Sequence, residues 1–266
     1  MDQIRLFIEL TKKALQRQMT YRAAIAAGVL TNLFFGLLRA AVLQALYVGR
    51  SEVAGITLPA AITYTGISQA TIGIFAAFSW FAIIRSVYSG EVSSDLLKPM
   101  DYFTFWLAQD WGRSIIELLL RSLPIMLAYA VVFGITVPHT AVQWLALAAA
   151  LWLGWLVSFA WRFLLNLSAF WTPNAIGVAR FGFVLSWFMS GFLMPLRFFP
   201  DWFVQICYLT PFPHTVNTVV EIYLGLLSGP EILMALGGQA LWAAVLIAAG
   251  QLVLQLGIRK LVIQGG

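Results

Sequence analysis

Six long apolar segments limit what this chain of 266 residues can fold into. Each approaches or exceeds the roughly 20 residues that an α-helix needs to cross about 30 Å of hydrocarbon. Because 61% of the residues are hydrophobic and only 10% are charged, the chain has too little polar surface for a water-soluble protein of this length. The pattern predicts an all-α membrane protein with six transmembrane helices, at residues 23–47, 60–84, 114–136, 141–163, 175–195 and 235–258.

The basic residues predict the orientation of these helices. Twelve of the 16 Lys and Arg residues, including Arg113 and Arg162, fall in the N-terminal stretch or in connections on its side of the membrane. Only Arg50 and Arg197 fall in connections on the other side. An excess of Lys and Arg in short loops marks the cytoplasmic face, so both termini are predicted to be cytoplasmic. Since the charges are spread over four inner segments, a nucleic-acid partner is not expected.

Residues 1–22 form a separate unit ahead of the membrane domain, which occupies residues 23–266. Apolar residues recur there at helical spacing and charged residues take the other side, which predicts an amphipathic helix in the inner headgroup plane. The alternative is a simple basic leader. The apolar segment that follows is too long for a signal peptide and contains Arg39, so we expect it to be retained.

The inner connection, residues 85–113, has the character of a docking surface. Two serines and Asp95 are able to begin a short helix, which Pro99 must end. Leu96 and Leu97 would then face water, and apolar residues in a charged inner loop suggest contact with a partner. The alternative is that both leucines pack against the bilayer or the third apolar segment.

The outer connection, residues 196–230, is too apolar for a free loop and too broken to span. Prolines at positions 195, 200, 211 and 213 interrupt it. Short re-entrant helices that enter the outer leaflet partway would explain both properties, because backbone at that depth must be sheltered by protein. Trp202 and neighbouring aromatic residues would lie at headgroup level.

Apart from Arg162 and Arg180, which are counted with the inner side, three charged residues fall inside the apolar segments, where charge is costly and suggests function. Glu117 and Arg121 are four residues apart on one helical face and are expected to pair, with contact to a substrate as the alternative. Arg39 lies nearer the outer end of its helix, too far from Glu117. Glu221 is its predicted partner in a latch at the outer gate, and the alternative is that Arg39 reaches the outer headgroups.

The sequence offers little chemistry of its own. Cys207 is the only cysteine, and His139 and His214 are isolated, so no zinc pattern or catalytic constellation is present. None of the four lysines follows a glycine, which excludes the Gly-Lys-Ser/Thr loop that cradles nucleotide phosphates. An ATP-driven activity would therefore need a separate ATPase chain, and the chain itself is predicted to bind no cofactor.

The order of these features resembles the permease subunits of the ATP-binding-cassette type-2 exporter superfamily, in its compact six-span branch. The shared features are the N-terminal interface helix, the six spans, the inner loop after the second span and the proline-rich outer segment after the fifth. The residues that carry the resemblance are Gly90, Glu91, Leu96, Leu97 and Pro99 in the inner loop, and Gly191, Pro195, Pro200, Trp202 and Pro211 in the outer segment.

This resemblance implies roles for two segments. Residues 86–101 would be the coupling loop that docks on the ATPase, and residues 196–230 would close the pathway from outside. Lys98 stands where many relatives carry an arginine. The implied site residues are Gly90, Glu91, Asp95, Leu96, Leu97, Lys98 and Pro99 for coupling, and Gly191, Pro195, Pro200, Trp202, Pro211 and Glu221 for the outer gate.

The resemblance also implies an assembly and an activity. Two permeases, identical or related, would work with two ATPase subunits that bind ATP and Mg, in the cytoplasmic membrane of a bacterium. Alternating access would move an amphipathic or lipid-like molecule, a drug or a glycan outward. The alternative is a secondary transporter or another ATP-independent six-span protein, although a transporter of that kind often carries a repeat between its halves and none is evident.

Overall fold

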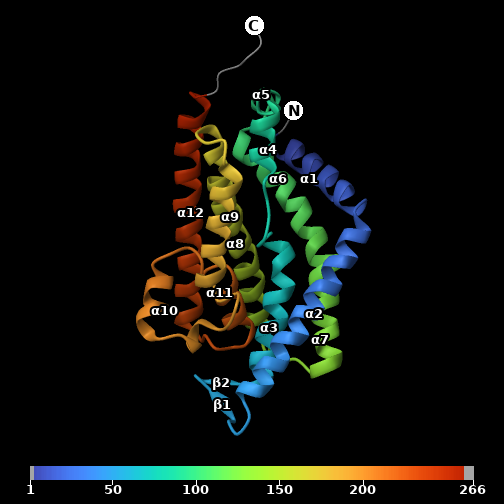
Figure 1. Ribbon diagram of the computed structural model, residues 1–266, viewed down its shortest axis with the longest axis vertical. Coiled ribbons are helices and arrows are strands. Elements are labelled where there is room, and N and C mark those ends of the chain that lie inside the picture. The colour runs from blue at the N-terminus through green and yellow to red at the C-terminus, as the bar shows by residue number, and fades with distance from the viewer. Residues whose placement is uncertain (1–2, 261–266) are drawn as a thin grey trace.

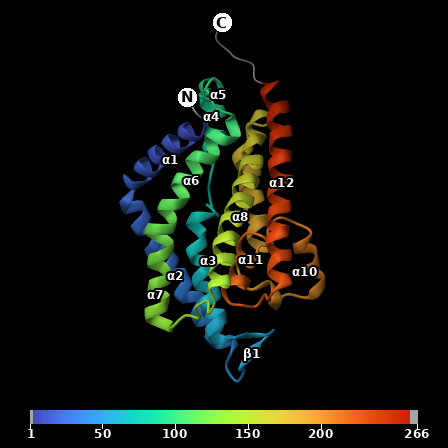
Figure 2. The same cartoon turned by 180° about the vertical axis from the view of Figure 1, so that it is seen from behind.

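The computed structural model describes residues 3–260, which form a helical bundle with one two-stranded hairpin at its end (Figures 1 and 2). The all-α prediction is therefore confirmed apart from this hairpin. The elements are α1 (Gln3–Met19), α2 (Arg22–Leu46), β1 (Glu52–Val53), β2 (Ile56–Thr57), α3 (Leu58–Ile74), α4 (Ala82–Ser89), α5 (Val92–Leu96), α6 (Tyr102–Glu117), η1 (Leu118–Ser122), α7 (Leu123–Phe133), α8 (Ala141–Asn166), η2 (Leu167–Phe170), α9 (Ala175–Met189), η3 (Leu196–Phe198), α10 (Asp201–Tyr208), α11 (Val216–Tyr223) and α12 (Pro230–Ile258).

Four helical segments in the described part of the chain are long and apolar enough to cross a membrane. They are α2, the continuous segment Tyr102–Phe133, the segment Ala141–Phe170 and α12. These correspond to the first, third, fourth and sixth predicted spans. The third begins twelve residues earlier than predicted, because the side chain of Asp101 accepts a hydrogen bond from the backbone N–H of Thr104 and caps the helix there.

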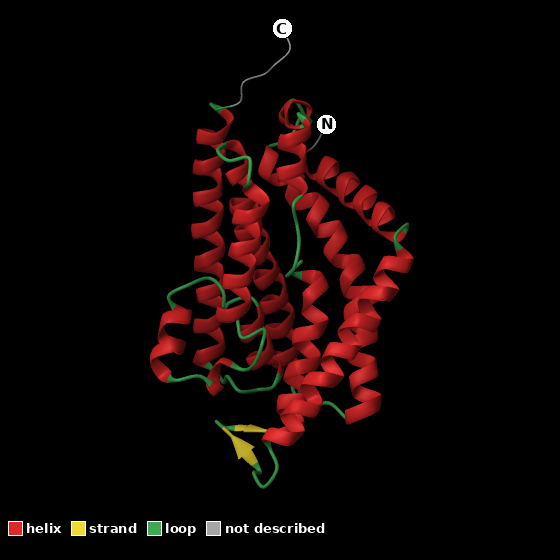
Figure 3. Ribbon diagram, viewed as in Figure 1, coloured by secondary structure: helices red, strands yellow, loops and turns green. Residues whose placement is uncertain are grey.

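The second predicted span is not one helix. Residues 60–84 contain the end of α3 and the start of α4, joined by a non-helical stretch at residues 75–81. Figure 3 shows this connection as a loop in the middle of the molecule, and we call it the gap. The gap contains no proline or glycine, so its cause lies in the surrounding helices, described below.

The fifth predicted span also differs in length, since α9 has 15 residues. It ends at Met189, and the chain then turns through Gly191, whose φ of 77° is in the left-handed region. Glycine tolerates this conformation without steric cost. The apolar sequence continues past this turn, which is why the pattern suggested a longer helix.

Two helices occupy the same face of the bundle. In Figure 1, α2 and α9 lie nearer the viewer than α7 and α8, and the reverse view in Figure 2 exchanges this order. The short helix α5 lies at the end of the bundle where α1 begins and α12 finishes, and the hairpin lies at the opposite end. The gap lies between the two ends of the bundle, near the middle of its height (Figure 3).

The N-terminal helix packs on the bundle and exposes part of its apolar surface. Thr11 and Ala14 of α1 are buried, and the Thr11 hydroxyl donates to the carbonyl oxygen of Ala108 in α6 at 3.3 Å. Ile4 and Ile8 remain exposed. Exposed apolar side chains are what a helix at a lipid headgroup surface requires.

Candidate functional site

The short helix α5 presents one apolar side chain at the end of the bundle. The side chain of Leu97, directly after α5, is 86% exposed, whereas Leu96 is half-buried against the core. The prediction that both leucines face water is therefore wrong for Leu96, because one turn of helix turns adjacent side chains in different directions. The predicted short helix itself is confirmed, although it begins at Val92.

A polar clamp fixes α5 on α4. Asp95 is buried, and its carboxylate accepts a hydrogen bond from the Ser86 hydroxyl at 2.6 Å and forms an ion pair with Lys98. The Lys98 ammonium also lies 3.7 Å from the centre of the Phe105 ring. Gly90 ends α4 with a φ of 78°. Of the predicted coupling residues, Glu91 and Pro99 remain exposed, so the loop is a rigid base with an exposed tip.

Side chains from three other helices hold the backbone of the gap. Arg113 of α6 donates to the carbonyl oxygens of Gly73 and Ile74, at 2.6 and 3.0 Å. The amide of Asn166, at the end of α8, donates to the carbonyl oxygen of Trp80 at 2.8 Å. Backbone carbonyl groups that have no hydrogen-bond partner within a helix need such side-chain donors inside a membrane protein.

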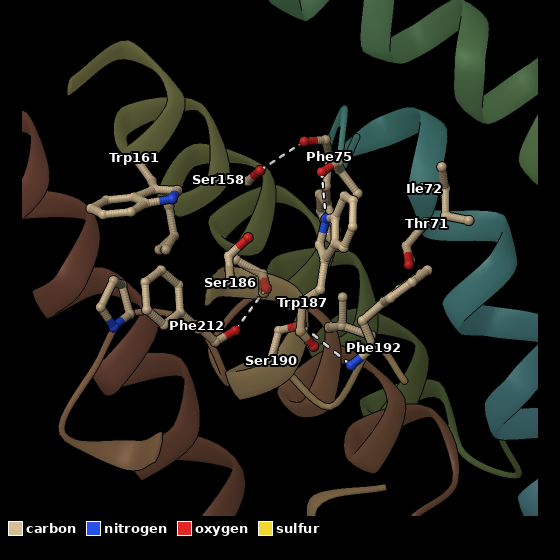
Figure 4. Close-up of a pocket in the computed structure, with 15 residues that line it drawn as sticks. Thr71, Ile72, Phe75, Ser158, Trp161, Ser186, Trp187, Ser190, Phe192 and Phe212 are labelled. Carbon is tan, nitrogen blue, oxygen red and sulfur yellow. Dashed lines mark hydrogen bonds between the residues drawn. The ribbon is translucent and has the colours of Figure 1, made fainter. Parts of the chain in front are cut away.

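Two further donors meet the centre of the gap in a small cavity of about 40 Å³ between α3, α8 and α9. The Ser158 hydroxyl donates to the carbonyl oxygen of Phe75 at 2.9 Å, and the Trp187 indole donates to that of Ala77 at 2.6 Å. Figure 4 shows Ser158 and Trp187 reaching this backbone from different helices. The backbone in and beside the gap is therefore held by four side chains of other segments.

A buried ion cluster lies directly beside the gap. The carboxylate of Asp110 accepts hydrogen bonds from both terminal nitrogens of Arg162, at 3.1 and 2.9 Å, from Arg113 Nε at 2.9 Å and from Trp155 Nε1 at 2.9 Å. The side chains of Asp110 and Arg162 are 0% and 2% exposed. Arg162 also approaches Ser158, so the cluster and the gap share donors.

The position of Arg162 corrects the sequence interpretation. We counted Arg113 and Arg162 as loop charges that report orientation, but both lie within helices and pair with Asp110. Asp110 itself was assigned to a loop. A signal existed in the sequence, because Asp110 and Arg113 are three residues apart in a run whose other residues are largely apolar, and charges of opposite sign at that spacing share a helix face.

The predicted pair between Glu117 and Arg121 is confirmed, with 3.4 Å between Arg121 Nη1 and Glu117 Oε2. Arg121 Nη2 also donates to the side-chain oxygen of Asn32 in α2 at 3.1 Å, and Gln18 of α1 donates to Glu117 Oε1 at 3.1 Å. Arg121 belongs to η1, a single π-helical turn between α6 and α7. Such turns widen a helix locally and are frequent at functional sites.

The outer connection has the broken form that its prolines predict. Pro195 precedes η3, Pro200 precedes α10, and Pro211 lies in the turn before α11. The Gly191 carbonyl accepts a hydrogen bond from the Tyr64 hydroxyl at 2.8 Å, which ties the connection to α3. Trp202 is exposed, as expected for a residue at a headgroup surface.

The predicted latch between Arg39 and Glu221 is wrong. Glu221 pairs with Arg197, at 2.7 Å from Arg197 Nε to Oε1, and is 3.5 Å from the Tyr208 hydroxyl. Burial lowers the pKa of Arg197, but the hydrogen bond to Glu221 and the negative charge of that carboxylate, with smaller contributions from Tyr208 and Glu231, raise the pKa overall. Arg39 instead donates to the carbonyl oxygen of Phe192 at 2.9 Å.

The alternative for Arg39, in which its side chain extends to the outer headgroups, is not observed either. Its guanidinium lies 4.6 Å from the centre of the Phe192 ring and 3.4 Å from the Ser68 hydroxyl. The turn at Gly191 leaves the carbonyl oxygen of Phe192 available to accept the hydrogen bond from Arg39. The distribution of charges along the sequence does not reveal such an acceptor. Arg39 therefore joins α2 to the end of α9 from within the bundle.

Comparison with known proteins places these features in a family. Residues 32–265 match the family described as ABC-2 family transporter protein, and this range includes the gap, α5 and the outer connection. The chain belongs to the ABC-2 transporter family. None of the curated proteins and none of the solved structures compared with it matches.

The family and the apolar helices make the chain a multi-pass membrane protein and the permease component of an ABC transporter. The resemblance found in the sequence is thereby confirmed. Membership also implies that this permease works with ABC ATPase subunits. Among the described residues, no group of three or more His, Cys, Asp or Glu side chains is arranged to hold a metal ion.

Proposed function

We propose that this permease is the transmembrane subunit of an ATP-driven exporter, in which closure of the ATPase subunits on α5 moves the helices on either side of the gap. The observation that carries the proposal is the combination of an exposed Leu97 with a buried carboxylate, Asp95, that holds the base of the loop. The Asp95 clamp joins α5 to α4, and α4 leads directly into the gap. A push on Leu97 would therefore reach the gap through α5 and α4.

The proposal includes six crossings of the membrane. We assign α3 with α4 to the second crossing and α9 with the turn after it to the fifth, because four longer helices account for the others. An even number of crossings places both termini on one side, in agreement with the basic residues near them. We further propose that α10 and α11 are re-entrant and close the outer end, in the cytoplasmic membrane of a bacterium.

The assembly follows from the face that α2 and α9 share. Both helices expose large apolar side chains, among them Phe34 and Phe35 of α2 and Phe181 and Phe188 of α9. We propose that a second permease, identical or related, meets this face, and that two ATPase subunits supply ATP and Mg binding. The transported molecule would be amphipathic or lipid-like and would be exported by alternating access.

Co-purification tests the coupling role. The tagged permease, extracted in mild detergent, is expected to bring a P-loop ATPase identifiable by mass spectrometry, and Leu97→Asp is expected to reduce its recovery at least tenfold. Leu209→Asp is the matched control, since Leu209 is 77% exposed in the outer connection. Leu96 is left unchanged because it contributes to packing.

The opposite results are equally informative. Equal recovery of the ATPase with Leu97→Asp would contradict the docking role of α5. A folded wild-type permease that never brings an ATPase would favour the alternative, a secondary transporter or another ATP-independent membrane protein.

A further inference from the structure

A polar cavity of about 310 Å³ lies beside the gap. Arg113, Glu117 and Arg121 line it on one side, and gap residues that include Phe78 and Ser79 line it on the other. It adjoins α2 through the contact of Arg121 with Asn32, and α9 through Phe78, whose ring is 4.6 Å from that of Trp187. The cavity is thus bordered by both helices of the face proposed to meet a second permease.

The charges around this cavity do not balance. Three arginines, Arg113, Arg121 and Arg162, share only two carboxylates within 4 Å among the described residues, those of Asp110 and Glu117. Asp110 is already saturated by Arg113 and Arg162. Each arginine has an ionic partner, but the five side chains together carry a net charge of about +1 inside a membrane domain, where uncompensated charge is costly.

The surplus belongs to the Asp110 cluster, because Asp110 pairs with two arginines and Glu117 with one, and Arg113 of that cluster lines the cavity. Arg121, the other arginine that lines the cavity, has a long ion pair with Glu117, at 3.4 Å, and Glu117 also accepts from Gln18. Arg121 Nε is buried and has no hydrogen-bond partner among the described residues. The C-terminus of α3 and the N-terminus of α4 both meet the gap, so their partial charges of opposite sign do not remove the surplus.

The other wall of the cavity is apolar. Phe78 is 47% exposed, and its ring packs against Trp187 and, at 5.7 Å between ring centres, against Phe192. The cavity therefore places guanidinium groups opposite an aromatic edge that continues toward α9. A ligand with an acidic head and an apolar body fits both walls.

We propose that this cavity binds the phosphate or carboxylate headgroup of an anionic amphiphile at Arg121 and Arg113, with the apolar part of the ligand against Phe78. The inference rests on the proposed transport function and narrows its substrate class from amphipathic to acidic amphiphile. A guanidinium group offers paired donors that match either headgroup. The bound anion would neutralise the charge that Asp110 and Glu117 leave over.

Binding of radiolabelled dodecyl phosphate tests the proposal. The probe is the alkyl phosphate itself, added to permease with its co-purified ATPase in phosphatidylcholine nanodiscs, with binding to empty nanodiscs subtracted. We expect saturable binding near one molecule per permease, and at least tenfold weaker binding of dodecylphosphocholine, whose ammonium cancels the phosphate charge. Equal binding of both probes would overturn the proposal.

Variants identify the residues. Arg121→Gln is expected to weaken dodecyl phosphate binding about tenfold or more, and Arg121→Lys to retain part of it. Arg39→Gln is the matched control, an arginine of a membrane helix that does not line this cavity, and should bind as the wild type does. Wild-type affinity in Arg121→Gln would overturn the assignment.

A second variant covers the case in which Arg121→Gln does not fold. Ser79 is exposed at the rim of the cavity, so Ser79→Asp adds a negative charge without removing an ion pair. It is expected to weaken dodecyl phosphate binding at least fivefold, and Ser79→Asn is expected to leave it unchanged. Equal weakening by both would indicate a steric effect and count against the proposal.

A transport assay distinguishes whether the bound anion is a transported substrate or a resident lipid. In proteoliposomes with the ATPase, ATP-dependent movement of dodecyl phosphate between leaflets would identify the ligand as substrate. Binding without movement, together with competition by phosphatidylglycerol, would identify it as a resident lipid of the same chemistry. A failure of the proposed function itself is detected separately, by a folded wild-type permease that brings no ATPase on co-purification.

Discussion

The two breaks in the helical bundle arise in different ways. The outer break, after α9, follows from the local sequence, because Gly191 adopts a left-handed conformation and prolines 195 and 200 stand before the next two helices. The inner break, at residues 75–81, contains neither residue type. It is held by Arg113, Ser158, Asn166 and Trp187, which belong to three other segments.

The two breaks therefore differ in whether motion of a neighbouring helix can change their shape. A break set by proline and glycine keeps its form whatever its neighbours do. A break whose carbonyls are held by distant side chains changes when those helices move. The inner break is therefore suited to respond to motion of α5, and the outer break to remain as a fixed frame.

The largest expected effect comes from removing a charge from the ion cluster beside the inner break. Arg162→Leu would leave Asp110 buried with only Arg113 as its ionic partner, and should lower the free energy of unfolding by about 3–5 kcal/mol. Denaturation by SDS in mixed micelles measures this. Arg180→Leu is the control, because Arg180 is exposed on α9. An equal effect of both substitutions would show that the cluster does not support the gap.

Gly191→Ala tests whether local geometry governs the outer break. The added methyl group would suffer left-handed strain of about 1–2 kcal/mol and meet Tyr64 and Asn217, for a total of about 2–4 kcal/mol. Gly90→Ala has a similar φ but open space around it, so only the strain of about 1–2 kcal/mol should appear in the same SDS titration. Similar values for both would mean that the Tyr64 contact contributes nothing.

Trp187→Phe asks how much one donor contributes to the inner break. The aromatic ring is kept, but the carbonyl of Ala77 loses its partner, which should cost about 1–3 kcal/mol in unfolding. Trp202→Phe is the control, since Trp202 is exposed in the outer connection. A Trp187→Phe protein as stable as the wild type would indicate that the gap does not depend on side-chain donors.

Arg197→Gln should have the smallest effect. Its ion pair with Glu221 joins side chains that are 39% and 7% exposed, and Tyr208 remains near the carboxylate. Partly solvated pairs contribute little, so we expect a loss of about 1 kcal/mol or less in unfolding. A loss as large as that from Arg162→Leu would remove the contrast between the two breaks.

The sequence predicted most of the fold and only part of the site. Apolar segments located the four long helices, and prolines located the breaks of the outer connection, because both signals are local. The pairing of Glu117 with Arg121 was predictable for the same reason. The gap and the partners of Arg39 were not, since they depend on carbonyl groups exposed by tertiary packing.

The π turn Leu118–Ser122 has a consequence at the level of the gene. A π turn holds one residue more than an α-helical turn, and that residue rotates everything beyond it by about 100° relative to what precedes it. Glu117 precedes the turn, and Ser122, which donates to the Ala70 carbonyl at 2.6 Å, ends it. Deletion of a single codon between them would restore a regular α-helix. Glu117 and Ser122 could then no longer both keep their present positions against α3. The arrangement around Arg121 is thus one in-frame insertion away from an ordinary transmembrane helix.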